Sequence, residues 1–234
     1  MNTPRFSAFR YSPVELLVAL TLLFILTPFI EVLPHGELID TILFTLVMIS
    51  AVLAVGGRRR TLIIAILLLV PALGIKWLDH VWPGKMAPEF SLVVGVLFFL
   101  FITGALLRFI LRAPRVDANV LCAGISGFLM LGLLWVPAYM LVASLNPAAF
   151  AIAHGTGAEL TMDDSNAFYF SFITLATVGY GDIAPVTKGA RMLAILEAIT
   201  GLFYMAVLMS RLVAVYSATS SRSEAREEEG AQRE

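Results

Sequence analysis

The strongest constraint on the fold of this chain is a series of long apolar segments that contain almost no charge. A hydrophobic run of about 18 or more residues predicts a helix that spans a membrane. The chain contains six such runs, which are Pro13–Val32, Leu38–Val55, Thr61–Leu78, Phe90–Leu111, Val116–Leu145 and Gly189–Tyr216. With 14% charged residues and a mean hydropathy of +0.88, the composition excludes an ordinary soluble domain. We therefore predict an all-α, multi-pass membrane protein.

The distribution of charge predicts the orientation of these runs. Arginines precede the first run, separate the second from the third, and follow the fourth and the sixth, whereas the opposite loops are mainly acidic. The basic residues are Arg5, Arg10, Arg58, Arg59, Arg60, Arg108, Arg112, Arg115, Arg211, Arg222 and Arg226. By the positive-inside rule we expect both termini in the cytoplasm and the protein in the cell membrane. Arg58–Arg60 are expected to contact anionic lipid headgroups.

We expect neither a cleaved signal peptide nor an intrachain disulfide. The first apolar run is long, lacks a convincing small-residue cleavage site and is followed directly by further runs, so we do not expect a signal peptide. The single cysteine, Cys122, excludes an intrachain disulfide.

The chain divides near Pro114. Residues 1–114 contain four predicted spans and form the expected N-terminal membrane domain. Residues 115–217 contain a long span, a polar stretch, a short apolar segment and a last span, and form the second expected domain. The polar stretch Asn146–Asp164 mixes Pro, Gly and acidic residues, which is typical of an extracellular loop. Residues 218–234 are expected to be a short cytoplasmic tail, too short for a ligand-binding domain. We expect this polar, Glu-rich stretch to be the solvated end of the last helix, followed by a frayed terminus.

A short apolar segment precedes the last span and cannot cross a bilayer. An acidic or serine cap at 163–165 is followed by about eleven helix-compatible residues, which fits a half-helix that enters and leaves the membrane on one side. The sequence TVGYGD follows at Thr177–Asp182. Non-helical backbone at membrane depth persists only where it is buried in protein or lines a water-filled path.

The backbone of this segment is the predicted functional group. Carbonyls that all point one way require dihedrals of alternating sign, and Gly179 and Gly181 adopt the left-handed ones without steric penalty. Val178 and Tyr180 would then point away from the path. Stacked carbonyls can replace the water shell of a cation, and the C-terminal end of the half-helix would favour a cation at the centre.

The segment Thr174–Asp182, TLATVGYGD, resembles the signature of the potassium-channel family, whose T-V-G-Y-G loops form the selectivity filter. The resemblance covers Val116–Tyr216 as outer helix, pore helix, filter and inner helix, and continues at Pro185, Thr187 and Arg191. It implies four pore domains around one axis, and therefore a homotetramer, because the chain has one copy of the motif.

The family resemblance also implies roles for individual residues. Thr177, Val178, Gly179 and Tyr180 would coordinate the permeant K⁺, and Asp182 would form a ring of carboxylates at the outer mouth. Filter support would come from Gly181, Tyr169, Phe170 and Thr174. The implied function is passive, potassium-selective conduction. No cofactor, enzymatic activity or nucleic-acid partner is expected, because the chain shows no metal cluster and no nucleophile–base pair.

Three departures from the family pattern leave a second interpretation of the function open. Tyr169 and Phe170 occupy positions that are tryptophan in many members, and Phe170 cannot donate the hydrogen bond that tryptophan often gives to the outer-mouth aspartate. Ile173 stands where some members have glutamate, and Ala176 replaces a common threonine. The alternative is a weakly selective monovalent cation channel of the same architecture. A potassium transporter would need four related loops in one chain.

The last span carries several candidate functional residues. Glu197 is a carboxyl well inside the span, which is a functional hypothesis by default. It could brace the pore helix through Ser171, Thr174 or Tyr169, or titrate and couple pH to the filter; the simpler alternative is a hydrogen-bonded, protonated structural carboxyl. Gly201 is either a gating hinge or a packing glycine. One helical face, which could line the cavity or simply pack, carries Met205, Met209 and Val213.

The first four spans do not have the charges of a strong voltage sensor. Such a sensor needs several cations that cross the field, but Phe90–Leu107 contains no charge. Arg108, Arg112 and Arg115 lie at the end of the fourth span, where they are expected to fix topology. We therefore predict weak or absent voltage dependence.

Overall fold

The computed structural model describes residues 13–30, 36–57, 59–81, 88–113, 117–153 and 161–231. Seven α-helices occur in these ranges: α1 (Pro13–Ile30), α2 (Gly36–Val55), α3 (Arg59–Val81), α4 (Pro88–Arg112), α5 (Ala118–Leu145), α6 (Asp164–Leu175) and α7 (Lys188–Ala231). Four of the arginines on which the predicted orientation rests, Arg5, Arg10, Arg58 and Arg115, lie outside the described residues.

Five of the helices are long and apolar enough to cross a membrane, namely α2, α3, α4, α5 and α7. This agrees with the predicted all-α, multi-pass membrane protein. The first predicted run, Pro13–Val32, is present as the shorter apolar helix α1. Helix α6 has 12 residues, too few to span a bilayer.

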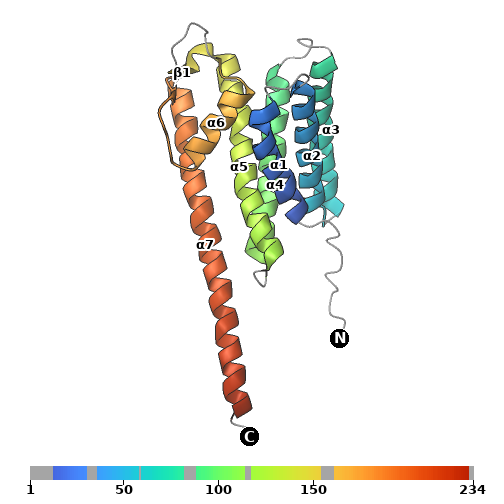
Figure 1. The fold of residues 1–234 in the computed structure, drawn as a ribbon, viewed down its shortest axis with the longest axis vertical. Coiled ribbons are helices and arrows are strands. Elements are labelled where there is room, and N and C mark those ends of the chain that lie inside the picture. The colour runs from blue at the N-terminus through green and yellow to red at the C-terminus, as the bar shows by residue number, and fades with distance from the viewer. Residues whose placement is uncertain are drawn as a thin grey trace.

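The helices form two groups that share α5 (Figure 1). Helices α1 to α4 make a bundle on one side, and α6 and α7 lie on the other side of α5. The bundle core is apolar and includes Leu16 and Leu20 of α1, Met48 of α2, and Phe98 and Ile102 of α4, all essentially without exposed surface. Since these side chains are buried between helices, they stabilise the bundle apart from any contact with lipid.

A close approach between helices places α6 against α5. The ring of Phe172 in α6 occupies the space that a Cβ at Gly132 of α5 would fill, so glycine is required there. On its other side the same ring packs against Phe24 of α1, with ring centroids 4.8 Å apart. Helix α6 is therefore held between the long helix α5 and the first helix of the bundle.

One feature differs from the sequence-based expectation. A two-stranded antiparallel sheet joins β1 (Phe150–Ile152) to β2 (Ile183–Pro185), with Ala151 opposite Ala184, so the fold is not entirely helical. Strands of three residues are too short to produce a recognisable alternation in sequence. As expected, the last helix extends beyond Tyr216 into the polar tail, and α7 continues to Ala231 (Figure 1).

Candidate ion filter and its supports

Helix α6 begins at a side-chain cap and ends where the glycine-spaced segment starts. The carboxylate of Asp163 accepts a hydrogen bond from the backbone N–H of Asn166 at 2.8 Å, which satisfies a donor of the first turn. The helix ends at Leu175, followed by Ala176 as its C-cap. The expected cap and the expected length of about eleven residues agree with this helix.

The backbone from Thr177 to Gly181 alternates in handedness. The φ angles of Thr177, Gly179 and Gly181 are 58°, 57° and 83°, whereas Val178 and Tyr180 have negative φ. Glycine adopts a positive φ freely. Thr177 does so at a cost of roughly 1–2 kcal/mol, and sequence reasoning missed this third left-handed residue. Such strain persists only where the surroundings over-determine the conformation.

Hydrogen bonds from the filter backbone to α6 fix this conformation. The Thr177 N–H donates to the Thr174 carbonyl at 2.9 Å, and the N–H groups of Val178 and Gly179 donate to the Ile173 carbonyl at 2.8 and 3.2 Å. The donors therefore face the end of α6. Within the described part of the chain, the carbonyls from Thr177 to Tyr180 accept no hydrogen bond, which leaves them available to another partner.

The side chains of the same segment are open in the single chain. Val178 is 51% exposed and Tyr180 is 73% exposed, and a Cβ at Gly179 or Gly181 would meet no atom within 4 Å. Exposed apolar and aromatic groups of this size beside unpaired carbonyls are typical of an interaction surface.

The outer end of the segment is held by Asp182. Its Oδ2 accepts a hydrogen bond from the Tyr169 hydroxyl at 2.6 Å, and its Oδ1 accepts one from the Ile183 N–H at 3.0 Å. The Asp182 carbonyl accepts from the Ala153 N–H at 2.7 Å, next to the β1–β2 sheet. Hydrogen bonding to Asp182 raises the pKa of Tyr169 to about 12.

Although Phe170 has no hydrogen-bond donor in its side chain, Asp182 still has an aromatic partner. Tyr169, the neighbouring residue, faces the aspartate. Phe170 instead is buried in an aromatic cluster, with its ring centroid 4.8 Å from that of Tyr139 and 5.6 Å from that of Phe150. In an α-helix, adjacent residues point about 100° apart, so Tyr169 and Phe170 point in different directions from α6.

Glu197 lies behind α6, fully buried. Ser171 Oγ is 2.6 Å from Glu197 Oε1, and the Tyr139 hydroxyl contacts Glu197 Oε2. Of the three partners considered from sequence, the structure brings Ser171 to this carboxyl. Tyr169 is bonded to Asp182 instead, and no Glu197–Thr174 hydrogen bond is present among the described residues. Sequence reasoning missed Tyr139; the one available signal was a tyrosine within an apolar span, where its hydroxyl needs a partner.

Gly201 lies one turn beyond Glu197 on the same buried face of α7. A Cβ there would come within 2.7 Å of the Leu175 carbonyl oxygen at the end of α6. This favours the packing role over the hinge role, because any larger residue would push α7 away from the end of α6. Met205, Met209 and Val213 are exposed on another face of α7 in the single chain.

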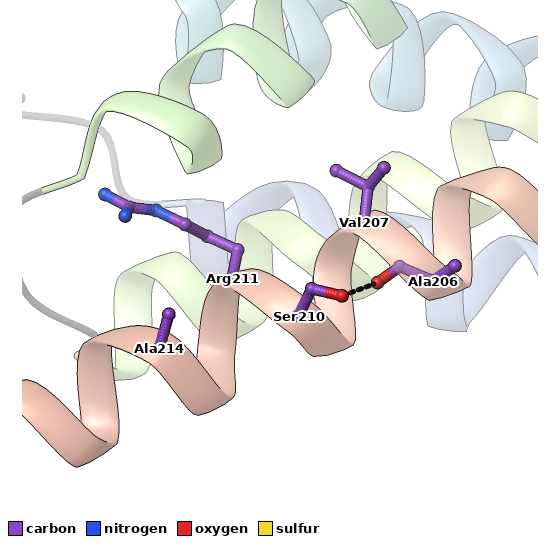
Figure 2. A pocket seen from close by; sticks show the side chains of 5 residues that line it. All are labelled: Ala206, Val207, Ser210, Arg211 and Ala214. Atoms are coloured by element: carbon purple, nitrogen blue, oxygen red, sulfur yellow. Dashed lines mark hydrogen bonds between the residues drawn. The ribbon is translucent and has the colours of Figure 1, made fainter.

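Further along α7, Arg211 reaches the other group of helices. Its Nη2 donates to the carbonyl of Ala113, just after α4, at 2.6 Å. Figure 2 shows Arg211 beside a pocket that is also lined by Ala206, Val207, Ser210 and Ala214. Ser210 donates its hydroxyl to the Ala206 carbonyl within the helix (Figure 2). The residues that line the pocket, 206–214, lie further along α7 than Gly201.

The described residues form a mostly helical membrane protein with unpaired backbone carbonyls at the end of α6, and the comparisons with known proteins point to ion channels. The model of the family described as "Ion channel" matches residues 125–218, which include α6, the filter segment and most of the apolar part of α7. The family is one of ion channels rather than enzymes.

The similar curated proteins are potassium channels. Two-pore potassium channel 4 of Arabidopsis thaliana is 44% identical over 59 residues, which are 25% of this chain and 20% of that protein. Voltage-gated potassium channel Kch of Escherichia coli (strain K12) is 48% identical over 46 residues, 20% of this chain and 11% of that protein. Potassium voltage-gated channel subfamily A member 6 of Homo sapiens is 34% identical over 79 residues, which are 31% of this chain and 15% of that protein.

These matches support a potassium-channel family for this chain, as the TVGYGD motif indicated. The matched segments are short, and they span at most about a fifth of the length of these three relatives.

Proposed function

We propose that this protein is a homotetrameric potassium channel that conducts K⁺ passively through a backbone-carbonyl filter at Thr177–Tyr180. The observation that carries the proposal is the alternating backbone of residues 177–181. The N–H groups of Thr177, Val178 and Gly179 bond to α6, and the carbonyls of residues 177–180 are left without partners in the described chain. Rings of such carbonyls replace the hydration shell of K⁺.

The single copy of the motif supports the proposed tetramer. A single row of carbonyls cannot surround an ion, and the chain carries one copy of the motif. Four copies around one axis would complete the rings. They would also cover the exposed Val178 and Tyr180, and part of the apolar surface of α7, which includes Met192, Leu196, Ile199, Leu202 and Phe203.

Charges at both ends of the proposed filter favour a cation. Helix α6 ends at Leu175, directly before the filter, so the partial negative charge of its C-terminus faces the inner side. Asp182 stands at the outer end, and four copies would form a ring of carboxylates that concentrates cations. In this proposal α6 is the pore helix, α5 the outer helix and α7 the inner helix.

Topology and location are part of the same proposal. Both termini would be cytoplasmic and the protein would lie in the cell membrane, with α1 as a sixth span. Residues 1–114 would form the N-terminal membrane domain and 115–217 the pore domain. Residues 218–234 would form the cytoplasmic tail, reached by the extended α7, and no cofactor would be needed for conduction.

A weakly selective cation channel is the second candidate. The observation in its favour is Ile173, which places a buried apolar side chain behind the filter where some family members have a carboxyl. The Tyr169–Asp182 hydrogen bond favours the selective filter, because it fixes the outer end of the same segment.

The deciding experiment is a reversal-potential measurement on purified protein in planar bilayers. With unequal K⁺ concentrations on the two sides and Na⁺ making up the difference, a selective channel gives a reversal potential close to the potassium equilibrium potential. A reversal potential that follows both ions equally would support the second candidate, and the absence of any cation current would contradict both.

A matched pair of glycine variants connects this current to the filter. Gly179→Ala adds a Cβ at a positive φ, which opposes the required conformation by roughly 1–2 kcal/mol in each subunit. We expect loss of selectivity or of current. Gly189→Ala, on α7, adds a Cβ that meets nothing within 4 Å and has no positive φ, so its current should match the wild type.

A further inference from the structure

Four polar groups from three helices meet behind the filter. They are the carboxyl of Glu197 in α7, the hydroxyl of Ser171 in α6, and the hydroxyl of Tyr139 and the carbonyl of Gly132 in α5. All three side chains are fully buried. Aromatic rings close the cluster on one side, since Tyr139 also packs against Phe170 at a centroid distance of 4.8 Å.

A count of protons gives the ionisation state of this cluster. Ser171 Oγ lies 2.6 Å from Glu197 Oε1 and 2.8 Å from the Gly132 carbonyl oxygen, and the Tyr139 hydroxyl contacts Glu197 Oε2. These three contacts need three protons. A serine hydroxyl and a tyrosine hydroxyl supply one each, so the third proton must belong to Glu197.

The charges around the cluster agree with this count. No described lysine or arginine forms an ion pair with Glu197. On its own helix, the Arg191 guanidinium is exposed and its Nε donates to the Pro185 carbonyl. Tyr139 of α5 is the titratable group that contacts the carboxyl, and Tyr169 of α6 is bonded to Asp182. An unpaired carboxylate in a buried, apolar setting would be very costly.

We propose that Glu197 keeps its own proton and is a positioning residue for the filter. The neutral carboxyl donates to Ser171 Oγ and accepts from Tyr139, while Ser171 donates to the Gly132 carbonyl. Every polar group of the cluster is then satisfied. This inference rests on the proposed channel function.

The position of Ser171 makes this cluster relevant to conduction. Ser171 lies two residues before Ile173, whose carbonyl accepts the N–H groups of Val178 and Gly179. The cluster therefore fixes the part of α6 to which the filter backbone is bonded. A shift of α7 would be transmitted from Glu197 through Ser171 to the filter.

A set of substitutions at Glu197 tests the positioning role. Glu197→Gln keeps a donor and an acceptor without a titratable proton, so its K⁺ over Na⁺ permeability ratio should lie within about twofold of the wild type. Its current should also vary with pH over about pH 5–8 as the wild type does. Glu197→Leu has a similar volume but no hydrogen bonds, and should lower the permeability ratio or the open probability about tenfold.

Each result has a consequence. If Glu197→Gln behaves like Glu197→Leu, the filter needs a charge and the neutral-carboxyl proposal is wrong. If Glu197→Leu behaves like the wild type, the positioning role is wrong. If the Glu197→Leu protein does not assemble, a second variant replaces it: Tyr139→Phe removes one hydrogen bond with little change of shape. It should then shift the permeability ratio or the open probability by several-fold in the direction expected for Leu, and a wild-type value would overturn the positioning role.

An infrared difference spectrum tests the proton without any current. The wild type minus Glu197→Gln at neutral pH should show the carbonyl stretch of a protonated carboxylic acid. A difference that contains carboxylate bands alone would overturn the proposal. Because this result does not depend on conduction, it separates a failure of the proton assignment from a failure of the proposed channel function.

Discussion

Tyr169 and Asp182 form the contact that joins the outer end of the filter segment to helix α6, at 2.6 Å. Tyr169→Phe keeps the ring but removes this donor from the carboxylate. We expect the outer filter to lose order, so that current declines several-fold faster during a sustained recording in low external K⁺. The decline is measured in bilayers beside the wild type. Equal rates of decline would show that the Ile183 N–H and the sheet suffice to hold Asp182.

The same hydrogen bond predicts a specific pH dependence. It raises the pKa of Tyr169 to about 12, above the ordinary value of about 10. The neutral tyrosine is the donor, so the contribution of the bond is complete below about pH 10 and is lost as the pH rises through about 12. Tyrosinate absorbance of the wild type minus Tyr169→Phe should titrate near pH 12. A midpoint near pH 10 would contradict the contact.

At the scale of elements, the packing of α7 against α6 depends on Gly201. A Cβ at this position would approach the Leu175 carbonyl oxygen to 2.7 Å, so Gly201→Ala should destabilise the protein by about 1–3 kcal/mol. Gly104→Ala, on α4, meets nothing within 4 Å and should be neutral or slightly stabilising. Thermal unfolding in detergent measures both. If the two variants unfold at the same temperature, α7 can move away from α6 without penalty, as a hinge would allow.

Helix α1 reaches α6 through an aromatic cluster. Phe24 lies 4.8 Å from the ring centroids of both Phe168 and Phe172. Phe24→Ala should lower stability by about 1–3 kcal/mol and should also disturb the filter, because it removes a support of α6. Phe29→Ala is the control, since Phe29 is 66% exposed on the same helix. A loss of similar size in both variants would indicate a general effect on α1 and not a support of α6.

Features with a strong local signal were predictable from sequence. Long apolar runs, the Asp163 cap and the glycine spacing at 179 and 181 each reflect a physical requirement of a few neighbouring residues. The left-handed Thr177, the β1–β2 pairing and the Tyr139–Glu197 contact were not predictable, because each depends on residues brought together by tertiary packing. The continuation of the last helix into the polar tail was also predictable, because Ser, Arg, Glu and Ala permit a helix there. Its end at Ala231 was not, since this polar stretch carries no apolar pattern.

At the scale of the whole molecule, the two groups of helices are joined at both ends of the bundle. Near one end Phe24 supports α6, and near the other Arg211 of α7 donates to the Ala113 carbonyl at 2.6 Å. Helices α4 and α5 are also close in sequence, since α4 ends at Arg112 and α5 begins at Ala118. The bundle of α1 to α4 is therefore placed to support the proposed pore of its own chain, a role that requires no movement of charge.

The charges of this bundle lead to a prediction about gating. A charge that crosses the whole membrane contributes about 2.3 kcal/mol per 100 mV, so steep voltage dependence needs several moving cations in each subunit. In α4 the segment Phe90–Leu107 has none, and Arg108 and Arg112 are exposed in its last two turns. Within the described bundle, the one ion pair joins Lys76 to Asp40 at 3.6 Å. Lys76 lies near the end of α3 and Asp40 near the start of α2.

We therefore expect a shallow conductance–voltage relation that Arg108→Gln leaves unchanged. Arg112→Gln, four residues further along the same helix, is the matched control for a change of surface charge alone. Both variants should shift the curve by at most a few millivolts through the local surface potential, and the shift should shrink at high salt because exposed charges are screened. A steep curve that Arg108→Gln flattens and Arg112→Gln does not would show that Arg108 senses the field, and would assign the bundle a gating role in place of a supporting one.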